Sequence, residues 1–539
     1  MALATGWILF GFCLVGSLIF SWCYILYLRS LRNEEKSAWT NFISVLCLTI
    51  TIVSAGLVPV DVFLVSSMKT SNGTYEEWAK DPQTRSALMW HVQLAYYALF
   101  SLILVLAFLV LPSTFFYFTA STLDEDEEGE AGEEVEAQST GKRLCRALKF
   151  TSASVLLLLV LIILGIFLPF EGTAHLTGEL KDKLLEEWYI MEDNKGFDLI
   201  LFLMNSVSVV GMFLLVIYTG CGLSSWPCQL LSGSSSGVNF NLSLLLNQIV
   251  ASEGRLEELQ QHEDDLNAFE REEVGRLQEE LRILNRSKQE LEEASRTCIN
   301  RLLKMLRPFQ VIFGIFGVLL LILITTSLTL TNVDKALHST AKAGYVLRNG
   351  TLPNPMDIAL VLSQRAFPLD YILYLGLVIF FVVTSINGVV RIGIRFLWLP
   401  LWRIKPHGTK PQALALMSLI LILILIALNV LLYALTPNYT TYGSQKFQII
   451  LPTNRTEILN CDDSHGPANE CNMTRVAFLL LAFHTKAWIF GAFYYWLTWV
   501  FIIILLIGSV YSLVQCKQRR GQMPAFIHHD DQDGLLSDD

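Results

Sequence analysis

Nine stretches of this sequence are apolar over about 20 residues or more and almost free of charge. They lie at about residues 7–28, 40–65, 92–118, 150–170, 198–222, 309–331, 368–390, 412–435 and 488–514. A helix needs roughly 20 residues to cross the hydrocarbon core of a bilayer. Because backbone amides in lipid must be satisfied within the segment, and no alternating ten-residue barrel pattern is visible, we predict an all-α polytopic membrane protein with nine transmembrane helices. The composition agrees, since 53% of the 539 residues are hydrophobic and only 16% are charged.

The distribution of Lys and Arg predicts which end of the chain lies on which side. If the N-terminus is luminal or extracellular and the C-terminus cytosolic, the inner segments (29–38, 119–149, 223–308, 391–411 and 515–539) hold 25 of these residues and the outer segments hold 14. Five N-x-S/T sequons fall on outer segments, and we predict that they are glycosylated: Asn72, Asn349, Asn438, Asn454 and Asn472. The sequons at Asn241 and Asn285 fall inside.

The spans and loops divide the chain into four parts. Residues 1–222 form a first membrane half with spans one to five and the loop 119–149, whose acidic run 124–136 is typical of disordered, solvated linkers. Residues 223–308 form a cytosolic loop. Residues 309–514 form a second membrane half that includes the luminal loop 436–475, and residues 515–539 form a cytosolic tail.

The loop 223–308 contains apolar residues at heptad spacing within 252–307, interrupted by Lys288 and Ser295. Two interpretations stay open. The segment is either a helical hairpin or long helix packed under the membrane bundle, or a coiled coil that dimerises the chain or binds a partner.

Two short patterns predict a disulfide and a sorting signal. Of the ten cysteines, only Cys461 and Cys471 lie on a predicted outer loop, where an oxidising lumen favours a disulfide over two free thiols. In the tail, Asp531 precedes Leu535 and Leu536 in an acidic dileucine pattern. Clathrin adaptors read this pattern when they route proteins to endosomes and lysosomes.

Enzyme motifs are absent from the sequence. It contains no phosphate-binding G-x-x-x-x-G-K-S/T loop, no G-x-S-x-G elbow, no H-E-x-x-H helix and no paired C-x-x-C metal knuckle. We therefore expect neither an enzyme nor an ATP-driven pump, no cofactor of its own, no metal site and no nucleic-acid partner. Membrane lipids are the expected surroundings.

The polar residues in the spans are then the remaining candidates for chemistry. Pro59 precedes Asp61 by two residues, Pro368 precedes Asp370, and Pro169 precedes Glu171, each near the predicted luminal end of a span. Proline frees an upstream carbonyl and can break a helix beside the carboxylate. Either these acids cap helix ends in the headgroup region, or they face a polar vestibule open to the lumen.

Several strings, each beside the corresponding span, resemble the limb-region-1-like membrane proteins. In order they are "VPVDVFLVSSMKTSNGT", "NVDKALHS", "FPLDYIL", "KPQAL" and "YGSQ". The resemblance runs over nearly the whole chain. It implies a lysosomal membrane protein that is required for cobalamin (vitamin B12) to leave the lysosome.

The same resemblance implies partners and a route through the cell. Expected partners are an ATP-binding-cassette transporter, which the protein escorts from the endoplasmic reticulum, and a cytosolic cobalamin-processing protein. The family is also linked to lipocalin uptake and to clathrin-mediated internalisation of the insulin receptor at the plasma membrane. Two alternative functions stay open: a gradient-coupled transporter that moves cobalamin itself through Asp61 and Asp370, and an endocytic receptor or adaptor.

Overall fold

The computed structural model describes most of the membrane-embedded chain. The described residues are 2–29, 37–119, 140–167, 195–232, short pieces between 246 and 288, 307–340, 344–346, 351–366, 368–396, 399–404, 408–450, 456–461 and 471–521. The acidic run 124–136, most of the heptad segment, Pro169, Glu171 and the tail with Asp531, Leu535 and Leu536 lie outside these residues.

Within these ranges, nine helices are long and apolar enough to cross a membrane, which confirms the predicted number of spans. They are α1 (Ala2–Leu28), α2 (Ala38–Ser66), α3 (Pro82–Val105) continued by the π-helical η3 (Leu106–Val110), α5 (Thr140–Phe167), α7 (Lys195–Leu214) continued by the π-helical η4 (Leu215–Thr219) and α8 (Gly220–Ser232), α12 (Arg307–His338), α14 (Leu369–Ile392), α15 (Pro411–Leu435) and α18 (Trp488–Gly521).

Shorter elements connect these helices at their ends. They are η2 (Glu77–Ala79), α13 (Pro355–Ser363), η7 (Gln364–Ala366), α16 (Pro437–Tyr442), α17 (Arg475–Lys486), β1 (Ile394–Phe396), β2 (Leu399–Trp402), β3 (Lys446–Ile450) and β4 (Thr456–Asn460). Each pair of strands forms a two-stranded antiparallel sheet, and β3 pairs with β4 from Lys446 opposite Asn460 to Ile450 opposite Thr456.

Several spans begin or end beyond their apolar runs. The third begins at Pro82 rather than near residue 92, because the Asp81 side chain accepts hydrogen bonds from the Gln83 and Thr84 amides and Pro82 occupies the first helical position. The sixth continues to His338, well past residue 331. Hydrophobicity alone does not show these extensions, because the added turns carry polar residues.

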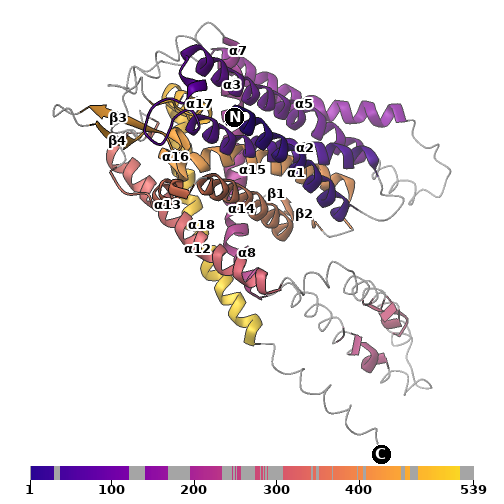
Figure 1. Cartoon of the computed structure of the whole chain (residues 1–539). Coiled ribbons are helices and arrows are strands. Elements are labelled where there is room, and N and C mark those ends of the chain that lie inside the picture. Colours follow the sequence, from indigo (N-terminus) through magenta and orange to yellow (C-terminus); the bar gives the residue numbers. More distant parts are fainter. Residues whose placement is uncertain are drawn as a thin grey trace, which may run out of the picture. The chain divides into compact units, whose positions relative to one another are not determined.

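The chain divides into two compact units. The first comprises residues 1–223 and 322–507, and the second comprises residues 224–321 and 508–539. In the first unit α2 and α15 lie in the middle of the helices and pack on each other, while α1, α14, α7 and α3 surround them (Figure 1). In α2 and α15, 89% and 83% of the residues in the most apolar window are buried, against 11% in the fourth span. These two helices therefore form the core of the first unit.

A close crossing joins η4 and α8 to α14 in the first unit. A Cβ atom at Gly388 would overlap the carbonyl oxygen of Tyr218, and one at Gly222 would overlap that of Thr384. The backbones approach this closely only because both positions lack a side chain. The hydroxyls of Thr219 and Ser385 form a 2.8 Å hydrogen bond across the same contact. Small residues and buried hydroxyls of this kind are how helices associate in lipid, where apolar side chains give no preference for the interface.

In the second unit, the last part of α8 packs against neighbouring helices. Leu231 lies 2.9 Å from the position that a Cβ atom would take at Gly314 of α12, and Ser224 lies close to Gly508 of α18.

Candidate functional site: a cap held by buried carboxylates

The outer polar cap consists of α13, α16, the β3–β4 hairpin and α17. It covers the helix ends that the sequence predicts to face the lumen. Buried apolar residues of α17 pack the cap against the spans, and specific polar contacts join it to them. Three buried aspartates, Asp61, Asp357 and Asp370, accept four hydrogen bonds that hold the cap together or join it to the spans.

Asp61 holds the start of α17. Its carboxylate is fully buried, and Oδ2 accepts a 2.9 Å hydrogen bond from the backbone amide of Val476. The positively charged Arg475 side chain also interacts with this carboxylate, and the Tyr96 hydroxyl lies beside it. The first amides of a helix have no partner within the helix and carry its positive dipole end, so a buried carboxylate there is stabilising. Asp61 thereby joins α2 to a helix more than 400 residues further along the chain.

Asp357 holds the start of α16, as Asp61 holds the start of α17. This buried residue of α13 accepts hydrogen bonds from the amides of Asn438 at 3.2 Å and Tyr439 at 3.1 Å. The Tyr439 hydroxyl in turn donates a 3.1 Å hydrogen bond to Oδ2 of Asp370, which is 1% exposed. Burial and the nearby Asp370 raise the pKa of Tyr439 well above its ordinary value, so the phenol keeps the proton that it donates.

A second set of polar contacts joins α13 to the ends of α12 and α15. The Asn354 side-chain oxygen caps α13 by accepting hydrogen bonds from the backbone amides of Met356 and Asp357. It also accepts a hydrogen bond from the Ser327 hydroxyl. Its amide group donates to the carbonyl of Leu435, the last residue of α15, at 2.8 Å, and to Thr331 of α12 at 2.9 Å. All four hydrogen-bonding positions of this buried amide side chain are therefore engaged.

Asp334 fixes the loop that leads into α13. Its carboxylate accepts from the backbone amide of Thr351 at 3.0 Å and from the Thr351 hydroxyl at 2.8 Å, and Nδ1 of His338 lies 2.9 Å away. Asp334, Asn354 and Asp357 were not predicted as site residues from the sequence. The only local signal was Asn354 before Pro355, a pattern typical of helix starts.

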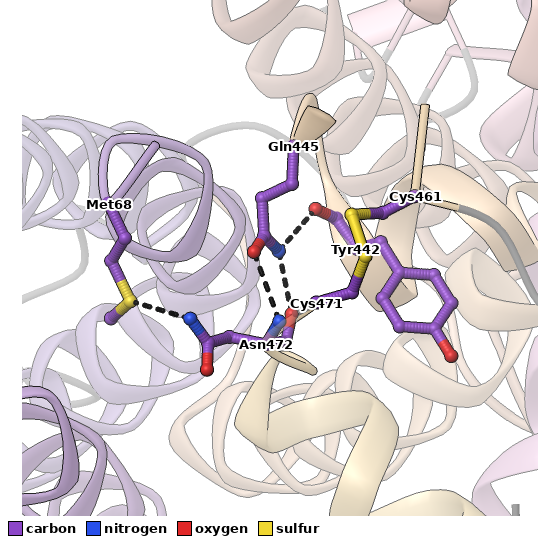
Figure 2. The surroundings of a disulfide bond; sticks show 6 residues. All are labelled: Met68, Tyr442, Gln445, Cys461, Cys471 and Asn472. Carbon is purple, nitrogen blue, oxygen red and sulfur yellow. Dashed lines mark hydrogen bonds between the residues drawn. A yellow bond between two sulfur atoms is a disulfide. The ribbon is translucent and has the colours of Figure 1, made fainter. Parts of the chain in front are cut away.

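The disulfide and Gln445 close the hairpin side of the cap (Figure 2). The structure joins Cys461 and Cys471 by a disulfide. Gln445 accepts from the amide of Asn472 at 3.1 Å and donates to the carbonyls of Asn472 and Tyr442. The Asn472 side-chain amide points at the sulfur of Met68 at the end of α2, 3.5 Å away.

The structure changes the interpretation of the proline–acid pairs. Pro59 lies inside α2, which continues to Ser66, so the helix break considered at this position is wrong. Pro368 directly precedes α14. Neither Asp61 nor Asp370 is exposed as a headgroup cap would be, since both are buried and hydrogen-bonded to the cap. The cap supplies a backbone amide to one oxygen of Asp61 and a tyrosine hydroxyl to one oxygen of Asp370. A polar vestibule at these residues stays a prediction.

The predicted glycosylation sites have different surroundings. Asn72 is exposed on the loop after α2. Asn438 and Asn472 are half-buried, and the threonines of their sequons, Thr440 and Thr474, are fully buried. Asn349 and Asn454 lie outside the described residues. Glycosylation therefore stays a prediction at all five positions.

Among the residues that the structure describes, no group of three or more His, Cys, Asp or Glu side chains is placed to hold a metal ion.

Comparison with known proteins places the chain in a family. The LMBR1-like membrane protein family matches residues 8–309. The chain belongs to this family. No solved structure matches.

Curated relatives match over the full length. A "Probable lysosomal cobalamin transporter" of Nematostella vectensis is 34% identical over 96% of this chain and 95% of its own. The "Lysosomal cobalamin transport escort protein LMBD1" of Gallus gallus is 34% identical over 100% of this chain and 97% of its own, and the Homo sapiens protein of the same name is 31% identical over 100% and 97%. The relatives are named as transport and escort proteins rather than enzymes.

Four of the five strings that carry the family resemblance contain residues that contact the cap or the loop leading into it. "VPVDVFLVSSMKTSNGT" contains Asp61, "FPLDYIL" contains Asp370 and "NVDKALHS" contains Asp334. In "YGSQ", the amide of Ser444 donates to Ser66 at 3.0 Å. "KPQAL" begins α15, and Gln412 donates to the carbonyl of Phe118 at 2.9 Å. In this chain, these polar residues join elements that lie far apart in the sequence.

Proposed function

We propose that this chain is a lysosomal membrane protein that escorts an ATP-binding-cassette transporter and is required for cobalamin to leave the lysosome. Full-length similarity at 34% and 31% identity to proteins named lysosomal cobalamin transport escort protein supports this function most directly. The sequence also lacks a phosphate-binding loop, so ATP hydrolysis has to come from a partner.

The buried carboxylates fit an escort better than a conduit. Asp61, Asp357 and Asp370 hold α16 and α17 in place, and such contacts give a rigid, folded cap on the predicted luminal side. A rigid folded surface suits recognition of another membrane protein, because little conformational entropy is lost on binding. The remaining proposed partners are the cytosolic cobalamin-processing protein and a clathrin adaptor.

The test is to delete the gene in cells that express the protein and to follow the partner transporter. Under this proposal, the transporter stays in the endoplasmic reticulum and its amount in purified lysosomes falls. Re-expression of the wild-type chain restores delivery. Normal delivery of the transporter to lysosomes in the deletion line would refute the escort function.

The tail is proposed to sort the protein itself. Leu535→Ala combined with Leu536→Ala removes two apolar anchors from a short adaptor-binding peptide, where a few side chains carry most of the affinity. The double variant is expected to accumulate at the plasma membrane at unchanged total amount, measured by surface biotinylation. Asp539→Ala serves as the control. If the double variant reaches lysosomes normally, the adaptor does not read this signal.

A second candidate is that the chain moves cobalamin itself. The name of the Nematostella vectensis relative, a probable lysosomal cobalamin transporter, favours it. Purified protein in liposomes would then carry cobalamin down a proton gradient without ATP. Absence of flux in sealed, correctly folded proteoliposomes rejects this candidate and leaves the escort proposal intact.

A further inference from the structure

A small cavity lies in the first unit between the ends of α12, α15 and α17 and the start of α18. Its volume is about 20 Å³. A single water molecule needs roughly 10–15 Å³ measured in this way, so the cavity has room for one water molecule or one monatomic ion. A metabolite is too large for it.

His484 of α17 lines this cavity and has a ring nitrogen, Nε2, without a hydrogen-bond partner among the described residues. The residue is 6% exposed, and this nitrogen is buried. The imidazole ring packs against the ring of Tyr494, with the centroids 5.1 Å apart. The Tyr494 hydroxyl donates to the carbonyl of Asn205 and makes no hydrogen bond with Nε2 of His484. Buried polar atoms almost always have a partner, so the free nitrogen indicates an occupant of the cavity.

Lys335 of α12 supplies a positive charge to the same cavity. Among the described residues that line the cavity, none is an aspartate or a glutamate. The neighbouring Asp334 binds Thr351 and His338 instead. The other titratable groups in the lining are the tyrosines Tyr345, Tyr433, Tyr494 and Tyr495. A half-buried ammonium without a carboxylate in the lining is a binding group for an anion.

The wall of the cavity is built by close backbone contacts. Gly344 has a φ of +64°, and a Cβ atom there would overlap the carbonyl oxygen of His484. The Tyr345 ring stacks on that of Tyr495 with centroids 3.9 Å apart. Residues 344–346 are thereby held against α17 and α18, and the lining other than Lys335 and His484 is mainly aromatic and apolar.

We propose that this cavity binds a halide ion, chloride, between the Lys335 ammonium and Nε2–H of His484. A monatomic anion fits a space of this size, needs only a few donors and tolerates aromatic walls. A sulfate or phosphate is too large and needs more donors. Nε2 of His484 has no partner among the described residues, and the Lys335 ammonium brings a positive charge to the same cavity. A chloride ion supplies an acceptor for both groups.

Chloride and proton binding are coupled at this site. Burial and the positive charge of Lys335 lower the pKa of His484 to about 3 in the empty site. A bound anion offsets both effects and raises the affinity of the imidazole for a proton. By linkage, protonation raises the affinity for chloride by the same factor, so chloride binds more tightly as the pH falls.

Thermal unfolding of the purified full-length protein in detergent tests the site. Unfolding midpoints are measured against chloride concentration at fixed ionic strength, with gluconate as the replacement anion, at pH 7.0 and pH 4.5. For the wild type we expect a saturable rise with chloride or bromide but not with sulfate. The apparent dissociation constant should be about threefold lower or more at pH 4.5.

Four variants separate the role of the Lys335 charge in binding chloride from the role of His484 in the pH dependence. Lys335→Met should abolish the chloride response, and Lys335→Arg should restore part of it. His484→Gln keeps a neutral donor and should still bind chloride, with the pH dependence lost. Lys80→Met, on an exposed side chain elsewhere, is the matched control. If the wild type does not respond to chloride, or if Lys335→Met responds as the wild type does, the cavity holds water and the proposal is wrong.

Discussion

At the scale of single residues, the polar groups buried near the helix ends hold the cap by hydrogen bonds to backbone. Asp61 and Asp357 each accept hydrogen bonds from backbone amides at the start of a helix, and Asp370 accepts one from a tyrosine hydroxyl. The sequence alone identified Asp61 and Asp370 as unusual. It could not identify their partners, because Val476 is 415 residues from Asp61 and no local pattern links the two.

Removing the Asp61 carboxylate should destabilise the protein. Asp61→Ala leaves the Val476 amide buried without this acceptor and removes a negative charge beside Arg475. We expect a loss of about 2–4 kcal/mol in the free energy of unfolding, read as a lower unfolding midpoint in detergent. Glu77→Ala, whose side chain is 94% exposed, is the control. Equal midpoints for Asp61→Ala and the wild type would contradict this structural role.

The stability of the chloride-free protein should depend on pH through His484. Its pKa is about 3 in the folded protein and 6.5 for an ordinary histidine, so between these values the unfolded chain takes up a proton that the folded state does not. Stability therefore falls as the pH drops from about 6.5 toward 3, by about 2–3 kcal/mol at pH 4.5.

Unfolding in gluconate buffers from pH 7.5 to pH 4.5 measures this contribution. His484→Gln should flatten the profile, whereas His91→Gln, on an exposed residue, should leave it unchanged. A wild-type profile with the same slope as that of His484→Gln would show that His484 is not held neutral.

At the scale of elements, the apolar runs predicted the spans well and the connecting pieces poorly. The core helices α2 and α15 coincide with predicted spans to within two residues. The short α13, α16 and α17 escaped prediction, because each is too short to be stable alone and depends on contacts with distant spans. The extra turns of α12 and α3 also escaped prediction, because they carry polar residues that the apolar runs do not include.

The close crossing of α14 with η4 and α8 gives a matched pair of glycine variants. Gly388→Ala places a Cβ atom on the carbonyl oxygen of Tyr218, whereas a Cβ atom at Gly376 of the same helix meets nothing within 4 Å. We expect Gly388→Ala to lower the free energy of unfolding by about 1–3 kcal/mol and Gly376→Ala to leave it nearly unchanged. Unfolding midpoints of the two variants decide this, and equal midpoints would mean that the two helices do not touch at Gly388.

At the scale of the whole molecule, the number of spans followed from the sequence, whereas the orientation is still a prediction. Treatment with a glycosidase tests it. Removing all five outer sequons at Asn72, Asn349, Asn438, Asn454 and Asn472 should abolish the shift in apparent mass. Among the described outer asparagines, the exposed Asn72 should carry more glycan than the half-buried Asn438 and Asn472. A shift that persists in the fivefold variant would place Asn241 or Asn285 in the lumen.

The most direct test of the proposed function is the ratio of lysosomal to cytosolic cobalamin in cells that lack this chain. Cells are fed labelled cobalamin bound to its carrier protein, lysosomes are purified, and label is counted in both fractions. The proposal predicts that label accumulates in lysosomes and falls in the cytosol, and that the wild-type chain reverses both changes. An unchanged ratio in the deletion line would contradict a requirement for this protein in cobalamin export.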